Sequence, residues 1–421
     1  MIASDIQPRH FDAPAPHCLG CGAPLTQTFV DLGDQPLANS YLPIDALPET
    51  ENFYPLHARV CHRCLLVQVD NVTPADAIFN ENYAYFSSFS SSWLDHCRRY
   101  VAAMTERFGL GADSQVVEIA SNDGYMLQYF VERGIPVRGI EPSGNVAAAA
   151  REKGIATEVA FFGRETAARL AGEGLRADLI AAKNVMAHVP DINDFVAGIP
   201  LLLNDKGVFT VEFPHLLNLI RENQFDTIYH EHFTYLSLLA VETVFARHGL
   251  AVFDVEEVPT HGGSLRVFAA RAGERTEQPG VQKVRDDELA AQLDRPEGYA
   301  GYDARVRAVR DGLLAFLAQA KQEGRIVAAY GAAAKGNTLL NYCGVTSDDI
   351  AFAVDRNPAK QDTLLPGSHI PVRDPAALEE DRPDYLLILP WNLTAEISAQ
   401  NVDFAARGGR FVVAIPELRI F

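Results

Sequence analysis

Residues 115–131 read Q-V-V-E-I-A-S-N-D-G-Y-M-L-Q-Y-F-V, and they contain the clearest sign of the fold. The stretch 115–121 predicts a buried strand, the N-D-G that follows predicts a turn, and the remaining residues have the apolar spacing of an amphipathic helix. Strand patterns recur in V-R-G-I-E-P-S (137–143), A-D-L-I-A-A-K-N-V (177–185) and G-V-F-T-V-E-F (207–213). This alternation predicts an α/β fold with a doubly wound parallel sheet, in which ligands bind at the carboxyl ends of the strands.

The last third of the chain repeats the same pattern. Residues 325–340, R-I-V-A-A-Y-G-A-A-A-K-G-N-T-L-L, predict a strand, a glycine turn and a helix, and two more strands are expected within 349–358 and 383–392. A helical connection is expected across 283–324. The sequence therefore predicts a second Rossmann-like α/β domain, and two such domains suggest two nucleotide-sized ligands.

Bulk properties narrow the class of protein. A chain of 421 residues is long enough for two or three domains, and its 48% hydrophobic and 22% charged residues are typical of globular proteins. The net charge of −19 and the absence of any Lys/Arg-rich run argue against nucleic acid as a partner. No apolar run is long enough for a membrane helix and the N-terminus lacks the pattern of a signal peptide, so we expect a soluble, cytoplasmic protein.

Four of the six cysteines form two short pairs, C-L-G-C at 18–21 and C-H-R-C at 61–64. Four thiolates can complete a tetrahedral Zn²⁺ shell, and such a closed shell is structural because it leaves no open position for chemistry. We therefore expect zinc to be bound by Cys18, Cys21, Cys61 and Cys64. A redox pair is the alternative, but no thioredoxin-like context supports it.

The first α/β unit has the parts of a class I methyltransferase, which binds S-adenosylmethionine. Glu118 lies in the first predicted strand, and Glu141 ends the second, where an acidic residue can accept hydrogen bonds from ribose hydroxyls. Gly124 in the turn would let the backbone approach the ligand closely. Asn122, in the turn after the first predicted strand, and Asn184, near the end of the strand predicted at 177–185, are further candidates for the cofactor site. The turn lacks Gly-x-Gly-x-Gly, so nicotinamide binding stays an alternative.

A cluster of proton-capable side chains, Y-H-E-H, occupies residues 229–232. Imidazole suits acid–base chemistry because its ordinary pKa lies near neutrality. A metal site and a structural hydrogen-bonded cluster are the alternatives. The segment 80–93, rich in Tyr, Phe and Ser, predicts either a packing linker or a loop that covers a ligand.

These motifs, from the double C-x-x-C through Y-H-E-H to G-A-A-A-K-G-N-T-L-L, resemble in order and spacing the C-3′ sugar methyltransferases. The resemblance begins near Cys18 and continues to the C-terminus. It implies a zinc-binding domain (1–75), a central S-adenosylmethionine-dependent methyltransferase domain (76–282) and a Rossmann-like domain that binds the sugar nucleotide (283–421). It also implies a dTDP- or GDP-linked 4-keto-6-deoxysugar as the substrate, and we expect a monomer or homodimer.

The resemblance further implies roles for single residues. His232 would remove the proton from C3 of the sugar, and Tyr229 and Glu231 would position the substrate or tune that base. His188 and Tyr83 would face the reacting carbon. A 4-keto group makes the neighbouring C–H acidic, so the enolate formed could attack the methyl group of the cofactor without a metal.

Two further stretches are candidates for substrate binding. In T-H-G-G-S-L-R (260–266), which resembles a family substrate-binding stretch, two glycines permit close backbone approach, and we expect His261, Ser264 and Arg266 to meet the substrate. In the last domain the turn 331–336 would hold a diphosphate at a helix N-terminus. The substrate-binding candidates there are Lys335, Asn337 and Asp355.

Three other functions remain open from the residues alone. An O- or N-methyltransferase would need no ketone in its substrate. Asp355 follows Gly331 at the spacing at which a dinucleotide-binding protein holds a ribose, so an NAD-dependent oxidoreductase is a second alternative. A zinc-ribbon interaction module with a degenerate methyltransferase domain is the third.

Overall fold

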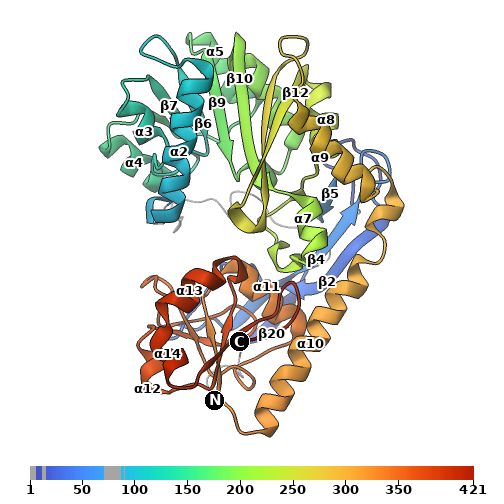
Figure 1. Cartoon of the computed structure of the whole chain (residues 1–421), viewed down its shortest axis with the longest axis vertical. Helices are drawn as coiled ribbons and strands as arrows, with labels where there is room; N and C mark the ends of the chain where they lie inside the picture. The colour runs from blue at the N-terminus through green and yellow to red at the C-terminus, as the bar shows by residue number, and fades with distance from the viewer. Residues whose placement is uncertain (1–5, 12–15, 71–86, 90) are drawn as a thin grey trace.

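The computed structural model describes residues 6–11, 16–70, 87–89 and 91–421, and these form three sheets flanked by helices (Figure 1). Tyr83, and most of the aromatic segment in which it lies, fall outside the described residues. Among the helices that are described, none is long and apolar enough to cross a membrane.

The central sheet has seven strands in the order β12-β13-β10-β9-β6-β7-β8. Five are parallel, and β13 and β12 complete one edge in antiparallel pairing. The chain order reverses at β6, so the expected ligand position is the carboxyl end of β6 and its neighbours β7 and β9. The strands are β6 (Val116–Ile119), β7 (Val137–Ile140), β8 (Thr157–Glu158), β9 (Ala177–Lys183), β10 (Leu203–Pro214), β12 (Leu250–Val258) and β13 (Ser264–Arg271).

Helices bury the apolar residues on both faces of this sheet, which confirms the doubly wound prediction. One face packs against α2 (Ser91–Phe108), α3 (Leu127–Val131) and α4 (Gly144–Glu152). The other packs against α5 (Arg164–Gly172), α6 (Ile192–Leu202), α8 (Leu238–Arg247) and α9 (Pro279–Ala290). Because α9 packs here through Val281 and Val284, the methyltransferase unit continues beyond the boundary expected at residue 282.

The C-terminal sheet repeats this plan around β14 (Val327–Tyr330). The neighbours β15 (Ala353–Val354) and β18 (Tyr385–Ile388) run parallel to it on either side, so a second set of carboxyl ends meets at β14. The other strands are β16 (Thr363–Leu364), β17 (Pro371–Arg373), β19 (Arg410–Val413) and β20 (Arg419–Ile420). The helices are α10 (Tyr302–Gln322), which is the long helix at the lower right of Figure 1, α11 (Ala334–Cys343), α12 (Ala377–Glu380), α13 (Thr394–Gln400) and α14 (Val402–Ala406).

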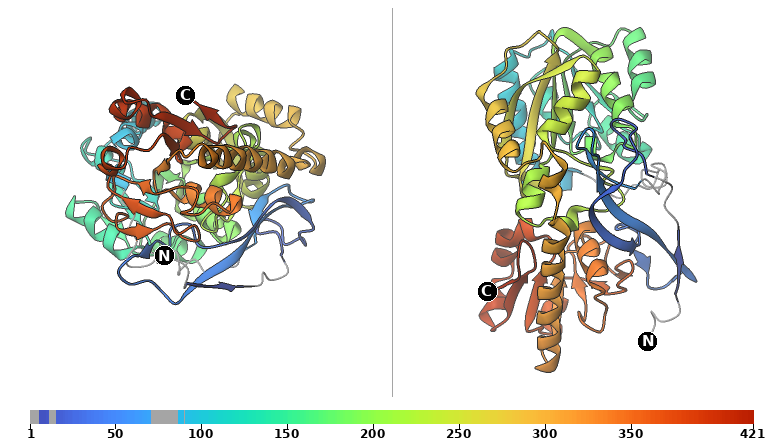
Figure 2. Two further views of the ribbon diagram at one scale, coloured as in Figure 1. Left: turned by 90° about the horizontal axis from the view of Figure 1, so that it is seen from below. Right: turned by 90° about the vertical axis from the view of Figure 1, so that its right-hand side faces the viewer.

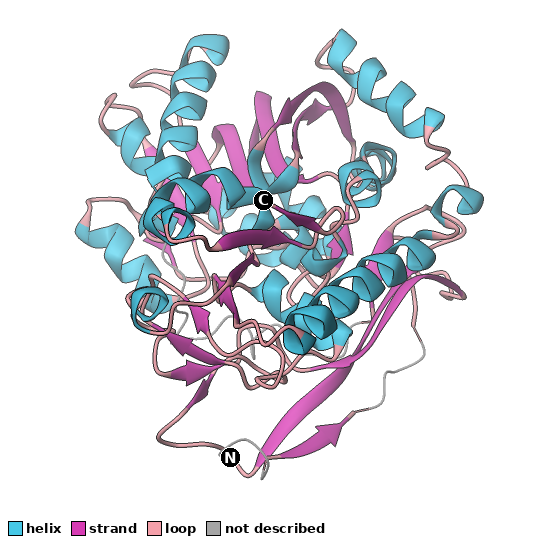
Figure 3. Cartoon of the chain, turned by 60° about the horizontal axis from the view of Figure 1, so that its bottom comes forward, coloured by secondary structure: helices cyan, strands magenta, loops and turns pink. Residues whose placement is uncertain are grey.

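The N-terminal domain is a small sheet that contacts both α/β domains (Figure 2). Its sheet lies beside the long helix α10 (Figure 3), and its apolar residues pack against that helix and the C-terminal core. Phe29 stacks there on Tyr302 with ring centroids 4.5 Å apart. Its cysteine pairs belong instead to the core of the methyltransferase domain. One short strand, β3 (Leu42–Pro43), joins the edge of the C-terminal sheet by pairing with β16. The other strands are β1 (Gln7–His10), β2 (Gln27–Gln35), β4 (Thr50–Val60) and β5 (Val67–Val69).

The segment 215–236 leaves the central sheet after β10 and crosses to the other two domains. It contains α7 (Leu216–Arg221) and β11 (Thr234–Tyr235), which pairs with β5 of the N-terminal sheet. Most of its buried apolar residues pack with the cores of the N- and C-terminal domains, and Leu236 at its end packs with the central sheet. The motif Y-H-E-H is in this segment, and so it lies where the three domains meet.

Candidate active site

Tyr229 and His232 form the centre of the cluster. A turn closed by the His232 N–H and the Tyr229 carbonyl, 2.9 Å apart, brings the two side chains onto one side of the chain. His232 Nδ1 lies 2.8 Å from the Thr227 carbonyl oxygen, and His232 Nε2 lies 2.8 Å from the Tyr229 hydroxyl. A carbonyl only accepts, so Nδ1 carries the proton and the neutral ring presents the Nε2 lone pair, to which Tyr229 donates.

His188 packs edge-on against His232, with ring centroids 4.6 Å apart. It ends the short helical turn Met186–His188 that follows β9. Its Nδ1 donates to the main-chain carbonyl of Glu231 at 2.7 Å, which leaves Nε2 as its basic nitrogen. Desolvation lowers the pKa of His188 to about 4, and desolvation is also the main cause that lowers the pKa of His232. Both imidazoles are therefore neutral near pH 7.

His261 and Lys335 complete the cluster from two further elements. His261 lies in the turn between β12 and β13, in a left-handed conformation (φ 54°), and Lys335 lies in the first turn of α11. Desolvation is the main cause that lowers the pKa of His232 and of His261, and the charge of Lys335 lowers both further. Lys335 Nζ lies 4.5 Å from the Trp391 ring centroid and donates to Asn392 at 2.7 Å. The C-terminal domain thus supplies a cation to the acid–base cluster.

The side chains of His230 and Glu231, which lie between the two central residues in sequence, contact the N-terminal domain instead. His230 is buried, packs against Tyr54 and donates from Nε2 to the Pro55 carbonyl at 3.2 Å. It is therefore part of the packing against the N-terminal domain and not a second base or metal ligand beside His232. The Glu231 carboxylate accepts from Asn39 Nδ2 at 2.7 Å.

The cofactor candidates gather at the carboxyl ends of β6, β7 and β9. The carboxylate of Glu141 accepts from the main-chain N–H groups of Asn122 and Ser143, both at 2.9 Å, and so ties the loop after β6 to the end of β7. Asn184, directly after β9, takes a left-handed conformation (φ 52°). Buried polar atoms here have no hydrogen-bond partner among the described residues: Ser121 Oγ, Asp123 Oδ1 and Asn184 Oδ1. Such atoms are the donors and acceptors that a polar cofactor would satisfy, so this set fits S-adenosylmethionine.

Glu118 and Gly124 lie beside this set, and both carboxylate oxygens of Glu118 are also buried without a hydrogen-bond partner among the described residues. Glu118 is completely buried in β6, and desolvation raises its pKa well above the ordinary value. A Cβ on Gly124 would lie 2.3 Å from Ile155 Cδ1, and φ there is 75°. The left-handed backbone and the close approach of Ile155 both favour glycine at this turn.

Three predicted substrate residues also have structural partners. Ser264 is buried and donates to the Thr260 carbonyl at 2.9 Å, so it holds its own turn closed. Asn337 is buried and donates to the Ala38 carbonyl at 2.6 Å. Arg266 is only 7% exposed and pairs with Glu212 and Glu256, both at 2.7 Å. This ion-pair network engages the guanidinium group that we expected to meet the substrate.

Asp355, at the end of β15, occupies the same topological position as Glu141. Its carboxylate accepts from the main-chain N–H groups of Ala332 and Asn357, both at 2.8 Å. In each α/β domain, then, an acidic residue after the second strand holds the loop after the first.

The turn 260–263 between β12 and β13 needs glycine for close packing, because a Cβ on Gly262 would lie 2.4 Å from the Trp391 ring. This close approach joins the two α/β domains.

The cysteine site has the geometry expected for zinc. The four sulfur atoms lie within 4.8 Å of one another, with Cys18 and Cys64 3.4 Å apart and Cys21 and Cys61 3.5 Å apart. A tetrahedral Zn²⁺ with Zn–S bonds of about 2.3 Å places its sulfurs about 3.8 Å apart. Asn193 of α6 holds the first pair by donating to the carbonyls of Leu19 and Gly20.

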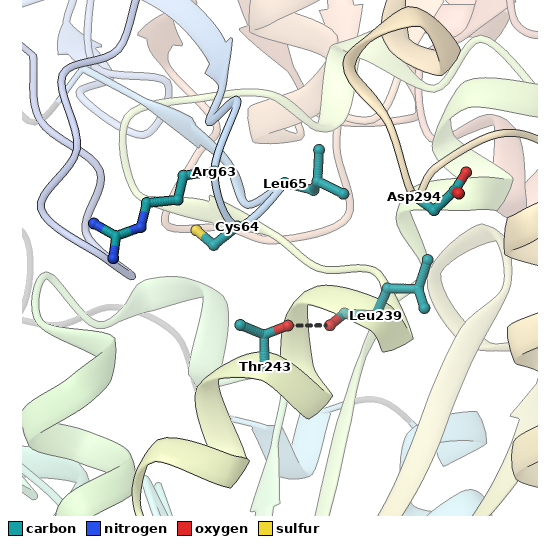
Figure 4. A pocket seen from close by; sticks show the side chains of 6 residues that line it. All are labelled: Arg63, Cys64, Leu65, Leu239, Thr243 and Asp294. Atoms are coloured by element: carbon teal, nitrogen blue, oxygen red, sulfur yellow. Dashed lines mark hydrogen bonds between the residues drawn. The ribbon is translucent and has the colours of Figure 1, made fainter.

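A cavity of about 190 Å³ adjoins this site, and none of the acid–base residues lines it. Figure 4 shows it between the second cysteine pair and α8, where Thr243 donates to the Leu239 carbonyl. Its lining residues are Arg63, Cys64, Leu65, Leu239, Thr243 and Asp294.

Sequence reasoning missed Asn39, Asp226 and Trp391. Trp391 donates from Nε1 to the buried carboxylate of Asp226 at 2.8 Å, which links the C-terminal domain to the segment that carries the acid–base cluster. The sequence offered only two signals for this pair. Asp226 is in the D-T-I that precedes Y-H-E-H, and Trp391 is in the W-N that ends a predicted strand. Asn39 lies in the irregular stretch between the cysteine pairs, where no periodic pattern exists.

Family models match three consecutive parts of the chain. Residues 18–79 match the model described as "Putative zinc binding domain", residues 93–255 match "Methyltransferase domain", and residues 259–416 match "C-methyltransferase C-terminal domain". Among solved structures, the chain is similar to magnesium protoporphyrin IX methyltransferase from Synechocystis (13% identity, TM-score 0.34, covering 47% of this chain and 89% of that one). It is also similar to the CcbJ methyltransferase from Streptomyces caelestis (13% identity, TM-score 0.34, 43% and 90%).

The doubly wound sheet, the cofactor set at its switch point and the matched models define an S-adenosylmethionine-dependent methyltransferase with a zinc-binding domain. Over 408 residues the chain is 37% identical to the C-methyltransferase NovU of Streptomyces niveus, with 97% of both chains covered. The chain belongs to this family of C-methyltransferases. Membership of this family decides for a C-methyltransferase over the three alternatives left open by the sequence: an O- or N-methyltransferase, an oxidoreductase and an interaction module.

Proposed function

We propose that the protein transfers a methyl group from S-adenosylmethionine to C3 of a nucleotide-linked 4-keto-6-deoxysugar. The nucleotide would be bound by the C-terminal domain, near Asp355, and the sugar would reach toward His232. The observation that carries the proposal is the pair of hydrogen bonds of His232, because they present the lone pair of Nε2 as a base. Methylation of carbon requires such a base, since a C–H bond must first lose its proton.

Each residue of the cluster has its own role in this step. His232 Nε2 takes the C3 proton after Tyr229 has moved its hydroxyl donation from the imidazole to the substrate. The ammonium group of Lys335 and the Tyr229 hydroxyl stabilise the negative charge that develops on the 4-keto oxygen. The cofactor, held by the set around Glu141 and Asn184, supplies an electrophilic methyl group. His188 and His261, neutral at pH 7, add no charge that would oppose proton abstraction.

A turnover assay with a panel of dTDP- and GDP-linked 4-keto-6-deoxysugars tests the proposal. We expect methyl transfer to one class of sugar nucleotide and, in deuterated water without cofactor turnover, exchange of the C3 proton. His232→Asn should lose both reactions and keep its affinity for S-adenosylhomocysteine. Methylation of an oxygen or nitrogen, or turnover without a ketone beside the methylated carbon, would contradict the proposal.

A further inference from the structure

The residues 35–43, Q-P-L-A-N-S-Y-L-P, cross from the zinc-binding domain to the C-terminal sheet, and we name them the crossing loop. Contacts fasten the loop on both sides of Asn39. Before it, the Ala38 carbonyl accepts from Asn337 at 2.6 Å. After it, the Tyr41 hydroxyl donates to the Ala332 carbonyl at 2.6 Å, and β3 pairs with β16.

Asn39 takes no part in this fastening. Its side-chain amide donates instead to Glu231 Oε1 at 2.7 Å, across 192 positions of the chain. Asn39 is exposed and Glu231 is partly buried, so the pair lies at an accessible edge of the acid–base cluster. The neighbouring Ser40 is equally exposed, and its main-chain N–H is bonded within the loop, to the Leu37 carbonyl.

Glu231 connects this contact to the reacting centre. Its main-chain carbonyl holds Nδ1 of His188, whose ring packs edge-on against His232. Burial raises the pKa of Glu231, and the hydrogen bond from Asn39 opposes that rise by stabilising the carboxylate. A charged, fixed carboxylate at this edge can accept a hydrogen bond from a sugar hydroxyl.

We infer that Asn39 of the zinc-binding domain is a positioning residue of the methyl-transfer site, acting through the carboxylate of Glu231. The zinc-binding domain thus contributes to the reaction through its crossing loop as well as to stability. This inference rests on the proposed function for the identity of the substrate, but the contact itself can be tested without any substrate.

Steady-state kinetics of Asn39→Ala and Asn39→Asp test the inference, with Ser40→Ala as the matched control. We expect kcat/KM to fall about ten-fold in Asn39→Ala, the loss that one charge-assisted hydrogen bond gives, and further in Asn39→Asp, where two carboxylates would face each other. The acid limb of the pH profile should move upward in the same order. Zinc content, melting temperature and S-adenosylhomocysteine affinity should match Ser40→Ala.

A double-mutant cycle separates positioning from folding. If Asn39 acts through Glu231, adding Asn39→Ala to Glu231→Ala should cause no further loss of kcat/KM. An equal further loss in the double variant, or a wild-type pH profile in Asn39→Ala, would overturn the inference while leaving the proposed function intact.

An NMR titration of the Glu231 carboxyl carbon tests the contact with Asn39 without any substrate. The signal is assigned by its disappearance in Glu231→Gln, and its pKa should rise in Asn39→Ala and stay unchanged in Ser40→Ala. An unchanged pKa in Asn39→Ala would overturn the inference. If no 4-keto sugar nucleotide is methylated, the proposed function fails, and this titration still decides the role of Asn39.

Discussion

His232 Nε2 and the hydroxyl oxygen of Tyr229 lie 2.8 Å apart, and the hydrogen between them belongs to tyrosine because His232 Nδ1 already donates to the Thr227 carbonyl. The base and its partner are three residues apart in sequence and come from one turn. Their geometry is therefore independent of domain movements, while His188, His261 and Lys335 reach the same centre from other elements.

Replacing either residue should affect the chemical step. In His232→Asn the amide can replace Nδ1 toward Thr227 but has no basic nitrogen, so kcat should fall by about 100-fold or more. In Tyr229→Phe the base remains and one donor is lost, and a smaller decrease, about ten-fold, is expected. Single-turnover measurements with bound cofactor will show both effects. His10→Asn, an exposed histidine on β1, serves as the control. Near-normal turnover in His232→Asn would show that His232 is not the base and would point to His188 instead.

The pH dependence of stability should reveal the buried carboxyl of Asp226. Burial raises its pKa to about 7, against 3.8 as the model value. Because the folded pKa is raised, the unfolded chain releases this proton first, and the stability contributed by the protonated form is lost as the pH rises from about 3.8 to about 7. Asp226→Asn keeps an acceptor for Trp391 and removes the titration. Its melting temperature should therefore exceed that of the wild type more at pH 8 than at pH 5, and the reverse order would contradict the assignment.

Zinc should be bound at about one ion per chain. Cys61→Ser should lower the metal content and the melting temperature, because the metal joins two segments that are 40 positions apart in the chain. Elemental analysis of purified protein measures the first effect and thermal unfolding the second. Cys343→Ser, a buried cysteine far from the cluster in sequence, should keep its zinc. Stoichiometric zinc in Cys61→Ser would show that the four sulfurs are not the ligands.

Cofactor affinity should depend on Glu141. In Glu141→Ala the ribose loses an acceptor and the loop at Asn122 loses its anchor, so the dissociation constant for S-adenosylhomocysteine should rise about 10- to 100-fold. Isothermal titration measures this change. Glu158→Ala on the neighbouring β8 is the control, since that carboxylate pairs with Arg169 on the surface. Equal affinities in the two variants would place the ribose elsewhere.

Local patterns predicted the features that depend on neighbouring residues in sequence. The stretch 115–121 gives β6 because burial on both sides selects mainly apolar residues, and the acidic residues after β7 and β15 are at the strand ends where they were expected. The paired cysteines predicted their own site for the same reason, since each pair fits one tight turn.

Contacts between segments that are distant in sequence could not be predicted from local patterns. Nothing local distinguishes His230, which packs on Tyr54, from His232, which faces Tyr229, because the choice depends on how segment 215–236 crosses three domains. Arg266 looked available for the substrate because its partners Glu212 and Glu256 are on other strands. Asn39 and Glu231 meet only after both domains have folded.

The two-residue pairing of β3 with β16 has a consequence for how the protein is made. Residues 42 and 43 leave the ribosome long before residues 363 and 364, so the first domain to be synthesised keeps an unmatched strand until almost the whole chain has emerged. A C-terminal fragment expressed alone would present the vacant edge of β16 to other molecules, and open edges of this kind promote aggregation. Exchanging the last domain between related enzymes will therefore require the matching crossing loop to be transplanted with it.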